Sequence, residues 1–220
     1  MKSIAVYYTG FFQMLPADCY NRYLQQLPVQ MQEKNNRFVR WQDKMADLLG
    51  KMLLLKALRS FGYQAQSLQC LQFNENNRPY LNTQTDFNIS HSGNYVACAI
   101  TNGIRVGIDI EEIRPVQLYD FKHVMTTSQW HSIAIAEDPL REFYRAWTIK
   151  ESVIKADGKG MSLPLTAIEF DKGNAYVGSL TWKLIEWGID PGYAACMATD
   201  YQADDLHIEY YRYACHKLDV

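Results

Sequence analysis

The stretch 106-VGIDIEEI-113 is typical of a β-strand whose side chains alternate between two chemical classes. Ile108 and Ile110 fall on one face of such a strand, while Asp109 and Glu111 fall on the other. Two carboxylates on one face repel each other, which destabilises a sheet unless something compensates their charge. A divalent cation would do so, because Mg²⁺ commonly takes one or two carboxylates as ligands. A pair of solvated acids on an exposed face is the alternative that this stretch leaves open.

A strong helix is predicted further along, over 139-PLREFYRAWTIKESVIKADG-158, with Asp138 as its N-cap and Gly158 at its end. Glu151 and Lys155 are four residues apart and therefore lie on one face of this helix. An ordinary surface ion pair would explain them. The functional alternative is a third carboxylate and a cation brought to one phosphate-bearing ligand.

A short polar turn interrupts the predicted strands of 87-FNISHSGNYVACAI-100. The hydroxyls of Ser90 and Ser92, the imidazole of His91 and the accessible backbone N–H groups can all bind phosphate oxygens. A plain hairpin is the alternative. A Ser–His hydrolase is not expected, since adjacent side chains on an extended chain point apart and no G-x-S-x-G elbow is present.

The remaining chain is predicted to alternate between helices and strands, and Asn102-Gly103 is a hairpin signal before the strand of the opening stretch. The other expected elements are a helix over 40–62 and strands over 3–8, 94–101, 165–171, 175–186 and 193–199. The segments 95-YVACAIT-101 and 193-YAACMAT-199 share four of seven residues, which suggests a duplication.

These patterns predict an α+β fold of two similar halves, spanning residues 1–102 and 103–220. The tail 206-LHIEYYRYACHKLDV-220 is aromatic and apolar at alternate positions, so we expect it to pack back on the first half.

The composition narrows the classes of function. A net charge of −2 argues against a general nucleic-acid binder, and five cysteines without a CxxC pair argue against a disulfide framework or zinc site. The opening run 1-MKSIAVYYTGFFQMLPADC-19 contains polar interruptions and fits a first strand better than a signal sequence. No window approaches the roughly 20 apolar residues of a membrane span, so we expect a cytoplasmic protein without a membrane partner.

Together, 87-FNISHSG-93, 107-GIDIE-111 and 147-WTIKESVIKADGKGMSLPL-165 resemble, in order and spacing, the surfactin-synthetase-activating type of 4′-phosphopantetheinyl transferase. The resemblance extends over nearly the whole chain, including 36-NRF-38. It implies a pseudo-twofold monomer with coenzyme A between its halves, Mg²⁺ as cofactor, and an apo acyl or peptidyl carrier protein as partner. The implied enzyme moves phosphopantetheine onto a carrier serine and releases adenosine 3′,5′-bisphosphate, which makes it a holo-[acyl-carrier-protein] synthase.

The resemblance also implies roles for individual residues. Asp109, Glu111 and Glu151 would bind the metal, while Glu151 and Lys155 would be catalytic. The coenzyme A contacts that it implies are Lys34, Arg78, Ser90, His91, Lys150 and Lys155. The segment 114-RPVQLYDFKHVM-125 would face the carrier with its apolar residues, among them Val116, Leu118, Phe121 and Met125.

The sequence departs from the family pattern at two places. Gln129 stands where a glutamate is usual, and Ala46-Asp47 replaces a frequent Arg-Thr pair. A homologue that binds coenzyme A or a carrier without turnover is therefore one alternative. A Mg²⁺-dependent phosphohydrolase that uses water is another.

Overall fold

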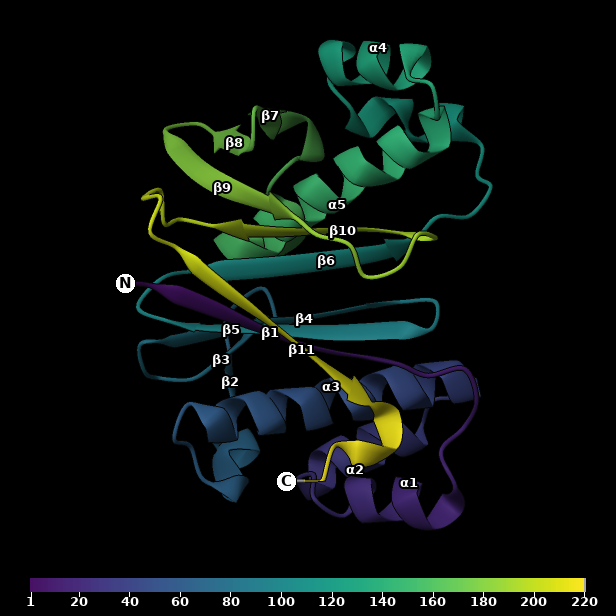
Figure 1. Cartoon of the computed structure of the whole chain (residues 1–220), viewed down its shortest axis with the longest axis vertical. Helices are drawn as coiled ribbons and strands as arrows, with labels where there is room; N and C mark the ends of the chain where they lie inside the picture. The colour runs from purple at the N-terminus through teal and green to yellow at the C-terminus, as the bar shows by residue number, and fades with distance from the viewer. Residues whose placement is uncertain (220) are drawn as a thin grey trace.

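Two β-sheets stack face to face, and each is covered on its outer face by one long helix (Figure 1). The computed structural model describes residues 1–219. The first sheet has the strand order β11-β1-β5-β4, in which β11 runs parallel to β1 and the other neighbours are antiparallel. Its strands are β1 (Ser3–Gly10), β4 (Thr85–Ser92), β5 (Tyr95–Asn102) and β11 (His207–Ala214).

The second sheet is antiparallel, with the order β6-β10-β9-β8-β7. Its strands are β6 (Val106–Glu112), β7 (Glu169–Asp171), β8 (Asn174–Val177), β9 (Leu180–Glu186) and β10 (Tyr193–Thr199). Helix α3 (Trp41–Ser60) packs on the first sheet and α5 (Pro139–Asp157) on the second. The two-half α+β architecture predicted from the sequence is confirmed.

Smaller helices and a two-stranded ribbon surround this stack. None of the helices within residues 1–219 combines the length and apolar character needed to cross a bilayer. The α-helices are α1 (Ala17–Leu24), α2 (Val29–Asn36) and α4 (Thr127–Ile135), and a two-stranded ribbon joins β2 (Gln72–Phe73) to β3 (Pro79–Tyr80). Short 3₁₀ helices are η1 (Ala65–Cys70), η2 (Leu118–Val124), η3 (Gly160–Ser162), η4 (Leu165–Ala167) and η5 (Cys215–Lys217).

The core between the two sheets depends on the alternation that the opening stretch predicts. Ile108 and Ile110 of β6 are fully buried there against Val6 and Ala97 of the first sheet. Asp109 points to the opposite face, toward α5. The predicted division of β6 into an apolar and an acidic face is therefore confirmed.

Helix α5 begins and ends where its capping residues predict. The side chain of Asp138 accepts a hydrogen bond from the Arg141 N–H at 3.0 Å, and Pro139 occupies the first turn. Gly158 adopts a left-handed conformation with φ of 80°, which ends the helix because other residues are strained there. The helix over 40–62 is likewise observed as α3.

Three expected strand features are wrong. Asn102-Gly103 does not close a hairpin, since β5 and β6 belong to different sheets and this turn carries the chain from one to the other. The expected strand over 175–186 is a hairpin of β8 and β9, because Gly178 has φ of 58° and turns the chain. The expected strand over 165–171 begins with η4, and only its last part, β7, is a strand.

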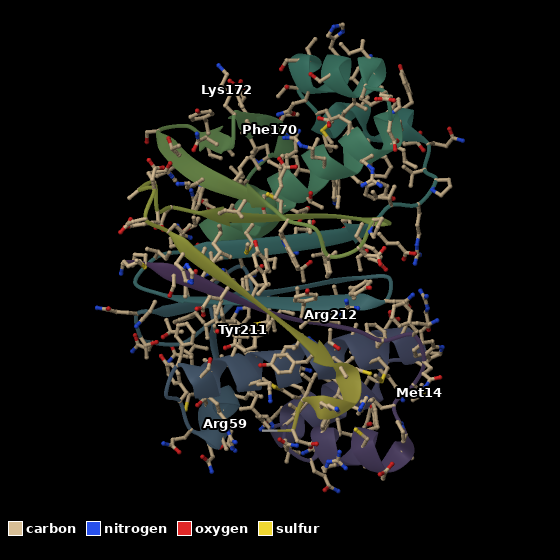
Figure 2. The ribbon with its side chains drawn as sticks, viewed as in Figure 1. Met14, Arg59, Phe170, Lys172, Tyr211 and Arg212 are labelled. Carbon is tan, nitrogen blue, oxygen red and sulfur yellow. The ribbon has the colours of Figure 1, made fainter. Side chains whose placement is uncertain are left out.

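The tail of the chain lies along the first strand. β11 pairs with β1 over eight residue pairs from Ser3 with His207 to Gly10 with Ala214. Tyr211 and Arg212 are exposed on the front of the molecule (Figure 2). The first sheet therefore contains residues from both ends of the described chain. The two similar segments of the sequence, β5 and β10, each occupy an interior position of their sheet.

The facing edges of the two sheets are joined by a ladder of side chains. Alternate residues of β4 accept hydrogen bonds, through their side-chain oxygens, from alternate backbone N–H groups of β6. The four contacts are Val106 N to Asp86 (2.8 Å), Ile108 N to Asn88 (3.0 Å), Ile110 N to Ser90 (3.3 Å) and Glu112 N to Ser92 (3.0 Å). We call these contacts the β4–β6 ladder. They satisfy edge N–H groups that would otherwise lack partners.

We expect Gly107→Ala to displace α5 from β6. A Cβ at this position would overlap the backbone of Ser152 and Ala156, which cannot move without moving the helix. Overpacking of this kind lowers the free energy of unfolding by about 1–3 kcal/mol or more. Chemical denaturation measures the loss. Gly188→Ala is the matched control, since its Cβ would meet nothing within 4 Å; equal stability of both variants would contradict the tight contact.

Candidate active site

Asp109 lies at the centre of a polar cluster between β6, β4 and α5. Its side chain is almost fully buried, with 2% of its surface exposed. Its Oδ1 accepts hydrogen bonds from the Lys155 ammonium at 2.6 Å and from the Ser90 hydroxyl at 2.9 Å. Its Oδ2 is buried without a hydrogen-bond partner among the described residues. A buried carboxylate oxygen left in this state is unfavourable and suggests that a ligand completes the site.

The hydroxyl of Ser90 is fully used inside this cluster. It donates to Asp109 and accepts from the Ile110 N–H of the ladder and from the Lys155 ammonium at 3.0 Å. Ser90 is itself 4% exposed. In this arrangement its hydroxyl donates its proton to the carboxylate and orients it, and the expected contact of Ser90 with coenzyme A stays a prediction.

Glu111 and Glu151 add two further carboxylates. Glu111 accepts a hydrogen bond from the Ser92 hydroxyl at 2.7 Å, so a second ladder residue orients an acid. Burial, and then the nearby charge of Asp109, raise the pKa of Glu111 above its usual value. The same two causes, in the same order, raise the pKa of Glu151. The three acids therefore lie close enough to interact electrostatically, as the alternation on β6 and the spacing on α5 predict.

Within residues 1–219, no three His, Cys, Asp or Glu side chains stand in a ready-made set of metal ligands. The chemistry of the three carboxylates nevertheless fits a divalent cation. Asp109 offers an unpartnered buried oxygen. Burial, and then the negative charge of Asp109, raise the pKa values of Glu111 and Glu151, and a cation would offset both effects. Lys155 supplies the positive charge that pairs with Asp109 in the structure.

Lys150 lies outside this cluster, and its expected role as a phosphate contact stays a prediction. Its side chain is fully buried, and its ammonium donates to the carbonyls of Leu165 at 2.6 Å and Ile168 at 3.1 Å. Burial lowers the pKa of Lys150 to about 8. Gln129 is also buried and donates to the Ile168 carbonyl at 2.9 Å. Both side chains therefore hold the segment after α5 in place.

Arg78 is engaged in an ion pair, and its expected contact with coenzyme A stays a prediction. Its Nη2 lies 2.9 Å from each carboxylate oxygen of Asp86. Asp86 and Ser92 occupy opposite ends of β4, and Ser92 contacts Glu111, so this ion pair lies at the far end of the ladder from Glu111. The structure does not bring Arg78 to the carboxylate cluster.

Lys34 and His91 lie on the α3 side of the first sheet. Lys34 is exposed on α2 beside a cavity of about 610 Å³ that Met31 and Phe73 also line. His91 is exposed at the end of β4, and partial burial of its ring, followed by the charge of Lys155, lowers the pKa of its imidazole. Neither side chain contacts Asp109, although the charge of Lys155 reaches His91.

Sequence reasoning missed the residues that hold the site together. Asp86 and Asn88 were not singled out, although they alternate with Phe87 and Ile89 along β4. Ser92 was expected to bind phosphate rather than to join β4 to β6. A strand with one apolar and one polar face can be recognised by this period of two. The need for glycine at 107, where α5 crosses β6, was also missed.

The variant Lys150→Met tests whether burial lowers the pKa of the Lys150 ammonium. Between pH 8 and 10.5 the unfolded chain keeps a proton on Lys150 that the folded chain has lost, since the folded pKa is about 8 and the ordinary value 10.5. The wild type should therefore gain stability over the variant as the pH rises through this range, by up to about 3 kcal/mol. Urea denaturation of both proteins at pH 7.5 and pH 10 measures the difference in their free energies of unfolding at each pH. A difference that does not change with pH would contradict the burial of the charge.

Comparison with known proteins agrees with the resemblance in the sequence. A family model described as the 4′-phosphopantetheinyl transferase superfamily matches residues 105–204. A second model, described as 4′-phosphopantetheinyl transferase, N-terminal, matches residues 16–102. The two matches meet where the chain passes from β5 to β6.

Three relatives illustrate the range of similarity. The chain is 31% identical over 208 residues to 4′-phosphopantetheinyl transferase Sfp of Bacillus subtilis (strain 168), covering 86% of this chain and 90% of that protein. It is 35% identical over 145 residues to 4′-phosphopantetheinyl transferase gsp of Aneurinibacillus migulanus, covering 64% of this chain and 61% of that protein. It is 37% identical over 107 residues to the L-aminoadipate-semialdehyde dehydrogenase-phosphopantetheinyl transferase of Homo sapiens, covering 44% and 34% respectively.

Proposed function

The chain belongs to the 4′-phosphopantetheinyl transferase superfamily and is an enzyme of phosphopantetheine transfer to carrier proteins, and from that premise we propose how its residues act. The donor is coenzyme A, and the acceptor is a serine hydroxyl of an apo acyl or peptidyl carrier protein. The serine oxygen forms a bond to the phosphorus that carries pantetheine. The bond from that phosphorus to adenosine 3′,5′-bisphosphate breaks.

The unpartnered, buried Oδ2 of Asp109 is the observation that carries this proposal. With Glu111 and Glu151, it offers a cation the oxygen ligands that Mg²⁺ prefers. When bound there, Mg²⁺ supplies positive charge that neutralises the oxygens of the pyrophosphate. The hydroxyls of Ser90 and Ser92 fix the directions of Asp109 and Glu111 before any ligand arrives.

Lys155 is the protein's own cation in this site. An ammonium has three N–H donors, and two of them are used by Asp109 and Ser90. Its side chain keeps 26% of its surface exposed, so the third donor can reach a phosphate oxygen from solvent. We propose that it stabilises the charge that develops on the transferred and leaving phosphates.

Glu151 is the proposed acceptor of the serine proton. Its raised pKa makes its carboxylate a better base than an ordinary exposed glutamate. It lies on the same face of α5 as Lys155, so the base and the cation act on one substrate. His91, with its lowered pKa, would be neutral at pH 7 and could hydrogen-bond a phosphate; Lys34 remains a proposed contact of the nucleotide end.

The proposed carrier surface is smaller than the sequence suggests. Val116, Leu118 and Phe121 are partly buried against the core below α4 and α5, and Met125 is buried. The exposed side chains beside them are Tyr119 and Lys122, which border a cavity of about 610 Å³ with Trp130. We propose that a carrier docks on these three residues.

We also propose a reducing, cytoplasmic location, which the five unpaired cysteines support.

We expect Asp109→Asn to lower the rate of transfer by about 100-fold or more, because the variant loses the central negative charge of the metal site. The measurement is the intact mass of an apo carrier protein after incubation with coenzyme A and Mg²⁺, with EDTA in place of Mg²⁺ as a second arm. Asp171→Asn, at an exposed position of β7, is the matched control. Wild-type rates in Asp109→Asn, or transfer that survives EDTA, would refute the metal assignment.

We expect Lys155→Gln to lower kcat by about 100-fold, since the ammonium acts on charge that develops in the transition state. Lys172→Gln, on an exposed turn (Figure 2), should leave kcat unchanged. Steady-state kinetics with a saturating carrier measure both variants. A Lys155→Gln variant that loses stability but keeps kcat would instead identify a plain ion pair. Phosphate release from coenzyme A without a carrier would favour a hydrolase.

A further inference from the structure

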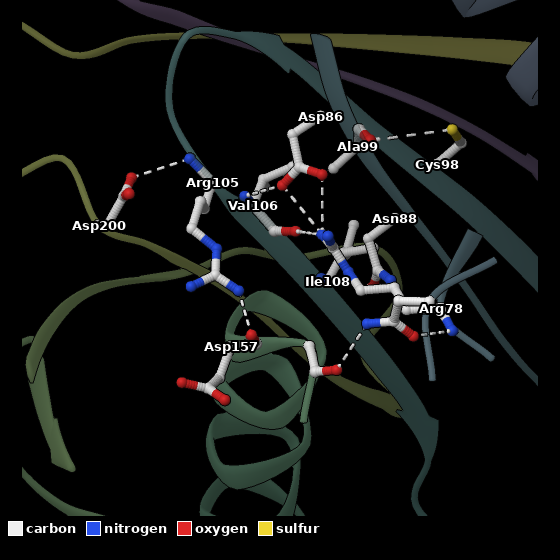
Figure 3. A network of polar contacts seen from close by, with 12 residues as sticks. Arg78, Asp86, Asn88, Cys98, Ala99, Arg105, Val106, Ile108, Asp157 and Asp200 are labelled. Carbon is white, nitrogen blue, oxygen red and sulfur yellow. Dashed lines mark hydrogen bonds and ion pairs between the residues drawn. The ribbon is translucent and has the colours of Figure 1, made fainter. Parts of the chain in front are cut away.

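Side chains from outside the second sheet cap the C-terminal end of α5. The last carbonyls of a helix have no partner within it. The carbonyl of Gly158 accepts hydrogen bonds from the side-chain amides of Asn74, at 3.1 Å, and Asn76, at 3.3 Å. The carbonyl of Asp157 accepts one from the guanidinium of Arg105 (Figure 3). The end of the helix is thus held by the loop between β2 and β3 and by the segment that leads into β6.

Asn74 connects the loop to the helix through one amide group. Its oxygen accepts hydrogen bonds from the backbone N–H of Asn76, at 2.9 Å, and of Arg78, at 2.8 Å. Its nitrogen donates to Gly158. Because both ends of the amide are used, the conformation of the loop fixes the direction in which the nitrogen points.

Arg78 fixes the base of the same loop to both sheets. Besides its contacts to the two oxygens of Asp86, its Nη2 donates to the carbonyl of Val106 at 3.1 Å (Figure 3). Asp86 in turn accepts from the Val106 N–H as the first contact of the ladder. The side chains of Arg78 and Asp86 are 15% and 16% exposed, so solvent screens this ion pair only weakly.

Arg105 is held from two sides. Its backbone N–H donates to Asp200 at 2.8 Å, and its guanidinium lies 5.3 Å from the centre of the Trp182 ring. A cation at the C-terminal end of a helix interacts favourably with the helix dipole. Arg105 therefore attracts the end of α5 from a fixed position.

We call these five side chains the clasp: Asn74, Asn76, Arg78, Asp86 and Arg105. We propose that the clasp fixes α5 along its axis and so sets the position of Lys155 and Glu151 against Asp109. Its members are positioning residues, and this inference rests on the proposed transferase function. It also gives Arg78 a role that needs no contact with the donor.

The distances explain why the clasp at the end of α5 affects the geometry of the site. Lys155 lies less than one turn before Gly158 and must place its ammonium 2.6 Å from Asp109. A slip of the helix by one residue would move it about 1.5 Å along its axis. A misplacement of about 1 Å can slow an enzyme about 100-fold. The contact at Gly107 holds α5 close to β6, while the clasp restrains its sliding.

The double variant Asn74→Asp, Asn76→Ala separates the helix cap from the fold of the loop. An aspartate at 74 keeps the oxygen that organises the loop, whereas both donors to Gly158 are gone. We expect kcat for transfer to fall by about 10-fold or more, with the KM for coenzyme A within about two-fold of the wild type. We also expect faster hydrogen exchange of the backbone amides in residues 151–158, measured without substrates.

Two further variants complete the test. Glu75→Ala lies in the same loop, where its exposed side chain makes no hydrogen bond within residues 1–219, and should leave kcat and exchange unchanged. Asp86→Asn releases Arg78 from its ion pair and should reproduce the loss of kcat. If Arg78 instead serves the donor, Asp86→Asn would leave kcat intact and change the KM for coenzyme A.

The following outcomes would overturn the proposal that the clasp positions α5, or would separate its failure from failure of the proposed function. Unchanged kcat and unchanged exchange in the double variant would overturn it. A lower melting temperature with a normal kcat at 15 °C would also overturn it, because the clasp would then serve stability alone. Failure of the proposed function looks different, since the wild type would then modify no carrier. In that case the exchange of residues 151–158 decides whether the clasp restrains α5.

Discussion

The β4–β6 ladder is the interaction on which the arrangement of this molecule depends. Two sheets that stack face to face leave edge N–H groups that neither sheet can satisfy with its own backbone. Here the side chains of β4 accept these bonds, so the sheets meet without merging into one. Ser90 and Ser92 also donate to Asp109 and Glu111. The atoms that join the two halves are thus the atoms that orient the acids.

The site brings three carboxylates close together, and the fold must stabilise this arrangement against their mutual repulsion. Burial, and then the negative charge of the nearby Asp109, raise the pKa values of both Glu111 and Glu151. Lys155 offsets part of this repulsion, and the close packing of α5 on Gly107 keeps the helix from moving away. Strained electrostatics of this kind are common where a protein is prepared for a ligand rather than for maximal stability.

Local patterns in the sequence predicted the local parts of this structure. The alternation of β6 gave its two faces, and Asp138 and Gly158 gave the limits of α5, since both depend on nearby residues. Alternation on β6 and helical spacing on α5 singled out the three acids and Lys155, and the resemblance implied their roles. Tertiary contacts decided the rest: Lys150 is buried because residues 165–168 fold over it, and Asn102-Gly103 links two sheets because β6 finds its partner in β10. No short-range pattern carries that information.

The pairing of β11 with β1 has a consequence for the order in which the molecule can assemble. Among the strands that the structure describes, β1 is synthesised first and β11 last. Until then, one edge of the first sheet stays open while the rest of the chain is being made. Open edges of this kind are where growing chains join the wrong neighbour. Synthesis of β11 is therefore the step that covers the exposed edge of β1 and completes the first sheet.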